Sequence, residues 1–380
     1  MQHSRDYSAS ASSRWLSCPA SVKEARQYQD KGSFAAQEGT AAHQLGEIGL
    51  KKNLTERDIL AYIGQTLSDA PTITIDKDMT YHVNGYVVYC RSFPGDHYVE
   101  VRVSYEHVAE GGFGTSDFIA IDPAGKKIVC VDLKYGKGIE VSAVDNSQAQ
   151  LYALGVINEY GFIYDFDETW QIEMHIYQPR IGNFSDWSIS YSELMRFADY
   201  VRERVALSKQ PNPPYKPTEK GCLWCKHKAN CVALMKHTEQ TIGAMFDDLD
   251  LPEATEVDVI NVLKNKKLIE SWLKAVEQNV FEKLNHGEKV EGFKLVAGRT
   301  SRKWSDESQA YETLSALYSD DELQTRKFIS VPQCEKLIGK AGFADYHELV
   351  IKSEGAPTLA PESDKRPDIN DVSDCFENIC

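Results

Sequence analysis

The chain has 380 residues, 42% of them hydrophobic, and a net charge of −15, so it can bury a sizeable core but is too acidic to bind nucleic acid through a general positive field. No apolar run approaches the ~18 residues of a membrane span, and the first residues lack the apolar core of a secretory signal, so we expect a cytoplasmic protein without a membrane segment. Residues 1–245 hold 30 acidic and 25 basic residues, which restricts contact with nucleic acid to local basic patches.

The first part of the chain is expected to be helical before it changes to a strand. Serines suited to helix capping precede Cys18-Pro19, and longer helices are predicted at 36–52 and 76–92. Valine then recurs at every second position within 98–103, which predicts a strand whose valines share one side and whose Glu100 lies on the other.

A β-hairpin is predicted next. The turn signal Asp122-Pro-Ala-Gly125 stands between two apolar runs. With Pro123 and Ala124 at the tip, Asp117 would lie opposite Cys130 and Asp132 on the diagonal.

Side-chain alternation would place Asp117, Asp132 and Lys134 on one face of this hairpin. Two carboxylates there are able to hold a divalent cation, with the ammonium positioning a water or offsetting charge on a phosphate. The alternative is an ordinary ion pair on a solvated sheet face.

The remaining elements complete an order of α, β, β, β, α, β, which predicts a mixed α/β (α+β) fold with a central sheet flanked by helices. A proline-rich connector at 210–217 ends this part. The other expected elements are helices at 145–160, 191–208 and 256–285, a strand at 170–177, a short hairpin at 289–304, and short helices within 306–352.

Two further polar groups have the chemistry of a metal-dependent site. Gln148 and Tyr152 lie four residues apart on a predicted helix and share one face, where they could orient a phosphate, a base or the carboxylates. His43 is a candidate ligand for Mn²⁺ or Mg²⁺, or a proton acceptor. A buried tyrosine beside a solvated glutamine, and a structural histidine, are the alternatives.

Nine cysteines in a long chain suggest free thiols and a metal site rather than a disulfide framework. Cys222, Cys225 and Cys231 have C-x₂-C-x₅-C spacing, which is one thiolate short of a tetrahedral set. Cys18 or His227 is the candidate for the fourth ligand. The cysteines by themselves favour zinc.

Taken in order, these motifs resemble the RecB-type branch of the PD-(D/E)XK nuclease superfamily over roughly residues 8–235. The superfamily has the same α, β, β, β, α, β core. The matching segments are Gly39-Thr-Ala-Ala-His43, an additional acid at Glu100, Gly114-Thr-Ser-Asp117, Asp132-Leu-Lys134, and Gln148 through Tyr152.

The resemblance implies metal ligands and catalytic roles. His43, Asp117, Asp132 and the carbonyl of Leu133 would bind one or two Mg²⁺ or Mn²⁺ ions. Lys134 would orient the attacking water, and the Gln148 and Tyr152 pair would position the substrate.

The resemblance also implies a [4Fe-4S] cluster, with zinc as the alternative. In the iron–sulfur members, such as the AddB-like and CRISPR-adaptation nucleases, one cysteine precedes the core and three follow it. Here that pattern falls on Cys18, Cys222, Cys225 and Cys231. The expected organisation is a nuclease core at 1–240, a helical region at 241–355 and an acidic flexible tail at 356–380.

The implied activity is metal-dependent hydrolysis of DNA, as an exonuclease on ends or single strands in phage recombination or replication. The whole chain also resembles a phage and prophage family of unassigned function. Possible partners are DNA and a phage single-strand annealing or binding protein, and the alternative is a non-catalytic DNA-binding or scaffold protein. Bases would stack on Tyr135, Trp15 or Trp224, and one basic patch is expected beside Trp304.

Overall fold

The computed structural model describes residues 4–28, 33–243 and 256–293. By its internal contacts the chain divides into two compact units, Met1–Lys289 and Val290–Cys380. Only the first unit is described below. The helices predicted within 306–352, the basic patch at Trp304 and the acidic tail lie outside the described residues, and the predicted domain boundaries stay predictions.

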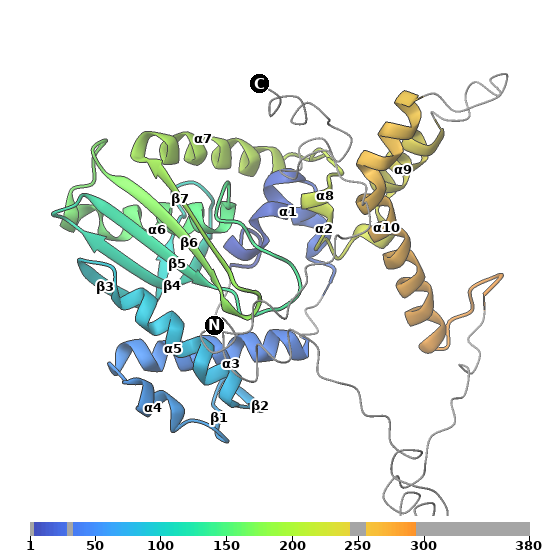
Figure 1. Cartoon of the computed structure of the whole chain (residues 1–380). Helices are drawn as coiled ribbons and strands as arrows, with labels where there is room; N and C mark the ends of the chain where they lie inside the picture. Colours follow the sequence, from blue (N-terminus) through green and yellow to red (C-terminus); the bar gives the residue numbers. More distant parts are fainter. Residues whose placement is uncertain (1–3, 29–32, 244–255, 294–380) are drawn as a thin grey trace, which may run out of the picture. The chain divides into compact units, whose positions relative to one another are not determined.

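A five-stranded mixed sheet forms the centre of the first unit, with the strand order β3-β4-β5-β6-β7 (Figure 1). Its strands are β3 (Asp96–Ser104), β4 (Phe113–Asp122), β5 (Lys127–Leu133), β6 (Gln171–Gln178) and β7 (Asn183–Ser190). All neighbours pair antiparallel except β5 and β6, which are parallel and therefore need the crossover that α6 (Ser147–Tyr164) supplies. The predicted mixed α/β fold is confirmed.

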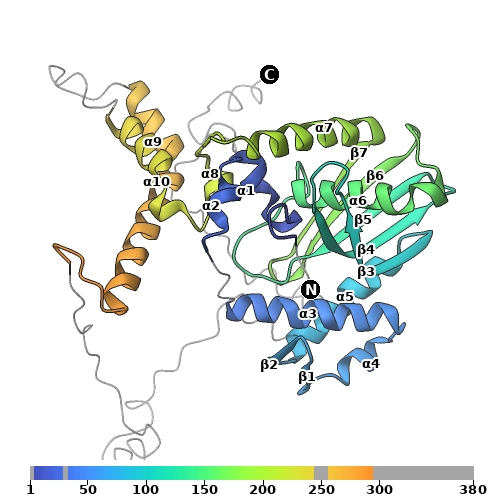
Figure 2. The same cartoon turned by 180° about the vertical axis from the view of Figure 1, so that it is seen from behind.

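Helices cover both faces of the sheet (Figures 1 and 2). Helices α6 and α7 (Tyr191–Ser208) lie on one side, and α3 (Phe34–Lys51) and α5 (Lys77–Arg91) lie on the other. Each face buries its own apolar cluster. Ile119 belongs to the cluster under α6, and its neighbour Phe118 belongs to the cluster under α3 and α5, as strand alternation requires.

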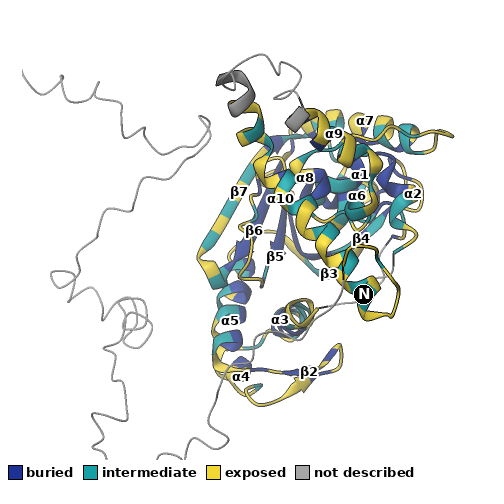
Figure 3. Ribbon diagram, turned by 90° about the vertical axis from the view of Figure 1, so that its right-hand side faces the viewer, coloured by how far each residue is buried: buried dark blue, intermediate teal, exposed yellow. Residues whose placement is uncertain are grey.

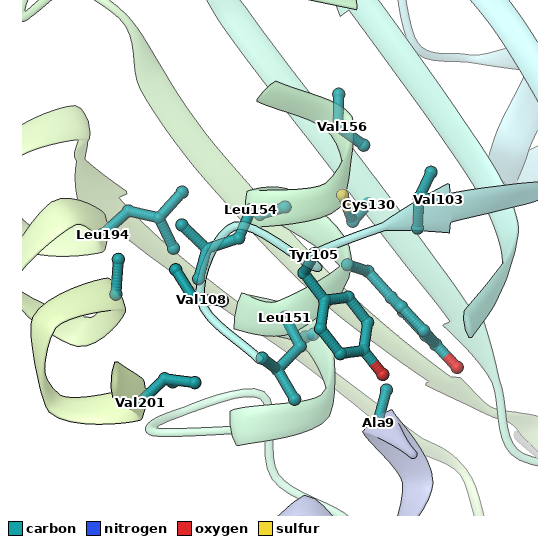
Figure 4. Close-up of a cluster of buried hydrophobic side chains, with 14 of the residues drawn as sticks. Ala9, Val103, Tyr105, Val108, Cys130, Leu151, Leu154, Val156, Leu194 and Val201 are labelled. Carbon is teal, nitrogen blue, oxygen red and sulfur yellow. The ribbon is translucent and has the colours of Figure 1, made fainter. Parts of the chain in front are cut away.

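The first cluster brings residues from distant parts of the chain together (Figure 4). Ala9 near the N-terminus, Tyr105 after β3 and Leu151 on α6 contribute to it, and Tyr105 is fully buried. Figure 3 shows that buried residues concentrate in the sheet and on the helix surfaces that face it.

The remaining elements are mostly short. They are η1 (Ala9–Ala11), α1 (Ser12–Ser17), α2 (Ser21–Ala25), α4 (Glu56–Leu60), β1 (Thr66–Leu67), β2 (Ala70–Thr74), η2 (Pro179–Ile181), α8 (Glu219–Cys222), η3 (Lys228–Asn230), α9 (Val232–Gly243) and α10 (Glu256–Asn285). Sequence patterns missed β7 and the β1–β2 hairpin. None of the described helices combines the length and apolar character that a membrane crossing requires.

The turn of the β4–β5 hairpin differs from the predicted one. Asp122 pairs with Lys127, so four residues connect the strands instead of two. The Asp122 carboxylate accepts a hydrogen bond from the Ala124 N–H at 3.1 Å, and Lys126 takes a left-handed conformation with φ 51°. These two features close a wider turn than Pro123 and Ala124 would form by themselves.

The wider turn changes which residues face each other. Phe118 pairs with Val131, two residues further along β5 than the predicted turn would place its partner. The predicted register was therefore wrong by two residues. Because two is the period of a strand, this error leaves the predicted alternation unchanged, and the shared face of Asp117 and Asp132 stays a prediction.

Glu100 breaks the alternation of β3. Its φ is +50°, in the left-handed region that residues with a side chain rarely adopt. Val99 packs with the cluster under α3 and α5, whereas Val103 belongs to the cluster under α6. The prediction that the valines share one side was wrong, because the left-handed residue rotates the backbone and exchanges the two faces.

Candidate metal centre

Three potential metal ligands converge at the edge of the buried sheet. His43 comes from α3, Glu100 from β3 and Asp117 from β4, and one ligand atom of each lies within 4.8 Å of the other two. His43 Nδ1 is 3.2 Å from Asp117 Oδ1 and 3.8 Å from Glu100 Oε1. A helix from early in the chain thus meets two consecutive strands at one point.

Helix α3 comes close to this point because small residues let it pack tightly on α5. A Cβ added at Gly46 would lie 3.2 Å from the ring of Tyr86, and one at Gly49 would lie 2.8 Å from Val87. The two glycines therefore allow contact between the helices without interrupting α3, which the Ser33 hydroxyl caps at its start.

The left-handed backbone of Glu100 belongs to the same site. A non-glycine residue in this conformation costs about 1 to 2 kcal/mol and is kept where the surrounding structure holds it in place. The neighbours of Glu100 on β3 pair with those of Asp117 on β4, Val99 with Phe118 and Val101 with Ser116. The strained backbone brings a second carboxylate toward His43.

A second set of polar side chains continues from Asp132. Lys134 Nζ is 2.9 Å from Asp132 Oδ2 and 3.1 Å from the amide oxygen of Gln148. The Gln148 amide nitrogen donates to Asp132 Oδ1 at 2.9 Å and to the Tyr152 hydroxyl at 3.0 Å. The predicted helix face is therefore in contact with the acid-x-lysine segment.

Gly114 makes room for this network. A Cβ at Gly114 would lie 2.6 Å from Cε1 of Tyr152, closer than such atoms approach one another in proteins. The glycine of Gly114-Thr-Ser-Asp117 thus allows the Tyr152 ring to pack flat against β4. This connects two motifs that are almost 40 residues apart in sequence.

A backbone donor holds Asp117 in position. The Leu133 N–H donates to Asp117 Oδ2 at 2.7 Å, which leaves the other carboxylate oxygen directed at His43. Sequence reasoning missed this role because a backbone amide has no sequence signal. The predicted ligation by the Leu133 carbonyl stays a prediction.

Burial and neighbouring charges oppose one another in setting the pKa values of the site. Burial lowers the pKa of His43, but the Asp117 and Glu100 carboxylates outweigh it and raise that pKa to about 10. Burial also raises the pKa of Glu100 and that of Asp132, and Lys134 offsets part of the second effect. The site therefore gathers carboxylates whose charges need compensation.

The donor set fits a divalent cation. Among the described residues, His43 Nδ1 and Asp132 Oδ2 are buried polar atoms that make no hydrogen bond of good geometry, although each has an ion-pair neighbour. One imidazole with several carboxylate oxygens suits Mn²⁺ or Mg²⁺. The structure brings Glu100 into the closest ligand group, whereas Asp132 lies beside Lys134; sequence reasoning placed Asp132 in that group and Glu100 outside the ligands.

The four predicted cysteines meet in a second place. Cys18 follows α1, and its thiol lines one small cavity together with those of Cys222, Cys225 and Cys231. Tight packing of α8 on α1 brings them together, since a Cβ at Gly221 would lie 2.7 Å from Ser17 Cβ. Cys90 and Cys130, by contrast, are buried in the apolar clusters.

Burial disfavours the thiolate form of the cysteines around the cavity, and two cationic side chains oppose this effect. Burial raises the pKa of Cys222 to about 11, while Arg14 and Lys228 exert favourable electrostatic interactions on the thiols. The Lys216 N–H donates to Cys18 Sγ at 3.5 Å. His227, the alternative fourth ligand, also lines the cavity but has its Nδ1 3.1 Å from the Tyr28 hydroxyl.

Comparison with known proteins identifies the family. The family described as "Protein of unknown function (DUF2800)" matches residues 3–367. The chain belongs to this family. A solved structure titled "Crystal structure of SSO0001" aligns with 58% of the DUF2800 chain and 95% of its own length, at 11% identity and a TM-score of 0.24, too low for any argument about fold or function.

The structure separates the three aromatic side chains that were predicted to stack on bases. Trp15 is fully buried and Tyr135 is 4% exposed, so neither is accessible in this DUF2800 protein and both predictions were wrong. Trp224 is 70% exposed. Trp15 and Tyr135 belong instead to the two apolar clusters on either side of the sheet.

Proposed function

We propose that this DUF2800 protein is a divalent-metal-dependent deoxyribonuclease of the RecB type, acting on DNA ends or single strands in phage recombination or replication. The observation that carries the proposal is the convergence of His43, Glu100 and Asp117 within 4.8 Å. Asp132 and Lys134 form an ion pair, and both are hydrogen-bonded to Gln148.

Each side chain has a chemical role in hydrolysis of a phosphodiester. A divalent cation supplies Lewis acidity, which activates water and stabilises charge on the phosphate. His43, Glu100 and Asp117 would hold it, and Asp132 would complete the ligands from its side of the site. Lys134 is placed to orient the attacking water or to balance charge that develops on phosphate oxygens.

Gln148 and Tyr152 would position the other groups of the site and take no part in making or breaking bonds. Gln148 holds the Asp132 carboxylate and the Lys134 ammonium at the same time, through its amide nitrogen and its amide oxygen. Tyr152 supports Gln148 from a buried position. A substrate phosphate would meet a preorganised group of donors.

A [4Fe-4S] cluster bound by Cys18, Cys222, Cys225 and Cys231 is the second part of the proposal. One cysteine before the core and three after it is the arrangement of the iron–sulfur relatives that the sequence resembles, and it supports this cofactor over zinc. The cluster would be structural, because hydrolysis needs no electron transfer.

The test of activity is degradation of end-labelled single- and double-stranded DNA with Mg²⁺ or Mn²⁺. Asp132→Ala and Lys134→Ala should each lose activity by at least about 10²-fold. The matched control is Lys127→Ala, since Lys127 also lies on β5 and pairs with a carboxylate, Glu173, at 2.6 Å. Full activity in both site variants would remove the proposed centre.

The test of the cofactor is metal analysis and absorbance of anaerobically purified protein. Wild type should be brown and contain iron, and Cys225→Ser should lose colour and stability because ligation contributes to folding free energy. Cys130→Ala, at a core cysteine, should keep the colour. A colourless zinc protein would contradict this assignment.

The competing function is a non-catalytic DNA-binding or scaffold protein of a phage recombination module, with an annealing or binding protein as partner. The filled ligand positions favour catalysis over it. Absence of cleavage in wild type, with retained binding to DNA, would favour the scaffold.

A further inference from the structure

A groove leads away from the candidate metal centre toward the cysteine segment. Its lining includes Lys134 and Gln148 of the centre, Ser10 and Ser13 of the N-terminal segment, and Lys220 and Trp224 near the cysteines. The groove thus connects the candidate metal centre with the segment that carries the cysteines. An occupant of the groove would contact both the Lys134 ammonium and an exposed indole.

Trp224 is the prominent aromatic of this groove. It lies between Cys222 and Cys225, both of which line the cysteine cavity, so its backbone is anchored on both sides. Its side chain is nevertheless 70% exposed. A large exposed indole on an anchored segment is suited to stacking against a flat ring from another molecule.

The other lining groups are polar and suit a phosphate backbone. Lys220 is exposed, and its neighbour Glu219 is directed to Lys267, with 3.6 Å between the carboxylate and the ammonium. The hydroxyls of Ser12 and Ser147, which also line the groove, lie 2.7 Å apart and join its two walls. Glu140 is the acidic member of the lining.

We propose that this groove binds single-stranded DNA, with a base stacked on Trp224 and a backbone phosphate paired with Lys220. A base in a duplex is already stacked, so the indole selects an unpaired strand. The inference rests on the proposed nuclease function, which it deepens by naming the substrate and its path to Lys134. It also implies that the segment from Cys222 to Cys225 takes part in substrate binding.

Binding of a fluorescein-labelled oligothymidylate of about 12 nucleotides to the full-length protein in EDTA tests the groove without cleavage. Trp224→Ala should weaken affinity roughly 5- to 100-fold, the range of one stacked base. Lys220→Ala should lower the slope of log K against log salt by about 0.7. Phe162→Ala, which removes an aromatic that is 87% exposed on α6, should change neither quantity.

A conservative variant separates stacking from a structural role. Trp224→Phe should restore most of the affinity but lose the quenching of tryptophan fluorescence that the oligonucleotide causes in wild type. Wild-type affinity in both alanine variants would overturn the proposal that this groove binds DNA. A loss of duplex binding in Trp224→Ala equal to the loss of single-strand binding would overturn the stacking.

Cleavage assays on the same variants keep this inference distinct from the proposed function. Cleavage of DNA by wild type together with Trp224-independent binding would reject the groove and leave the nuclease in place. Trp224-dependent binding without cleavage would reject the nuclease and leave the groove as a strand-binding site.

Discussion

The left-handed backbone at Glu100 allows its strain and its carboxylate to be tested separately. Glu100→Gln and Glu100→Gly both remove the charge, but only glycine adopts φ +50° without steric cost. The two variants are therefore matched controls for each other.

The expected difference follows from the backbone. Glycine at position 100 relieves the strain of the left-handed conformation, which stabilises the folded protein by about 1 to 2 kcal/mol. Glycine in a strand costs about 0.5 to 1 kcal/mol in entropy. The free energy of unfolding of Glu100→Gly should therefore exceed that of Glu100→Gln by about 1 kcal/mol.

Urea unfolding in EDTA measures this difference. A glycine variant no more stable than the glutamine variant would refute the strain. Repeating the series with Mn²⁺ tests ligation, since ligand at 100 times Kd stabilises by about 2.7 kcal/mol. Both variants should gain less than wild type at the same Mn²⁺ concentration, and an equal gain would remove Glu100 from the ligands.

Three further predictions concern His43, Gly114 and Gly95. Because the Asp117 and Glu100 carboxylates outweigh burial and raise the pKa of His43 to about 10, above its unfolded value of 6.5, its stabilising contribution is complete below pH 6.5 and is lost as pH rises through about 10. Urea unfolding in EDTA from pH 6.5 to about 10 should show a smaller loss of the free energy of unfolding in His43→Gln than in wild type. Equal losses would contradict this contribution of His43. Gly114→Ala should displace Tyr152 and lower kcat by about 10²-fold, while Gly161→Ala, which meets open space, should not. Gly95 has φ +97°, and a Cβ added there would lie 2.1 Å from the Ile121 carbonyl oxygen. Gly95→Ala should therefore lower the free energy of unfolding by more than ~2 kcal/mol in the same assay, and an unchanged value would contradict this packing.

Hydrophobic periodicity was sufficient for the long elements of the fold. Helices α5, α7 and α10 begin and end within one residue of the predicted limits. Strand β7 was missed because most of its residues are exposed or half-buried, and no alternation of apolar residues marks it. It pairs with β6 through backbone hydrogen bonds, which leave no pattern in the sequence.

The candidate site was predictable in its membership and less so in its arrangement. The turn of the hairpin was predicted two residues too short, because Asp122 pairs with Lys127, and such an error preserves strand parity. The position of Glu100 was not predictable, since a left-handed residue in a strand has no periodic signal. The exposure of Trp224 likewise depends on how α8 packs, which residue type alone does not indicate.

The cavity formed by the four cysteines has a consequence for the topology of the chain. Cys18 and Cys222 are about 200 residues apart, and a shared cofactor would close this stretch into a loop. For a covalent link, closure of such a loop removes about 5 kcal/mol of conformational entropy from the unfolded chain. A cofactor that also bound Cys231 would be completed only after the whole sheet has been synthesised, and its colour would report that the cysteines at both ends of this stretch have come together.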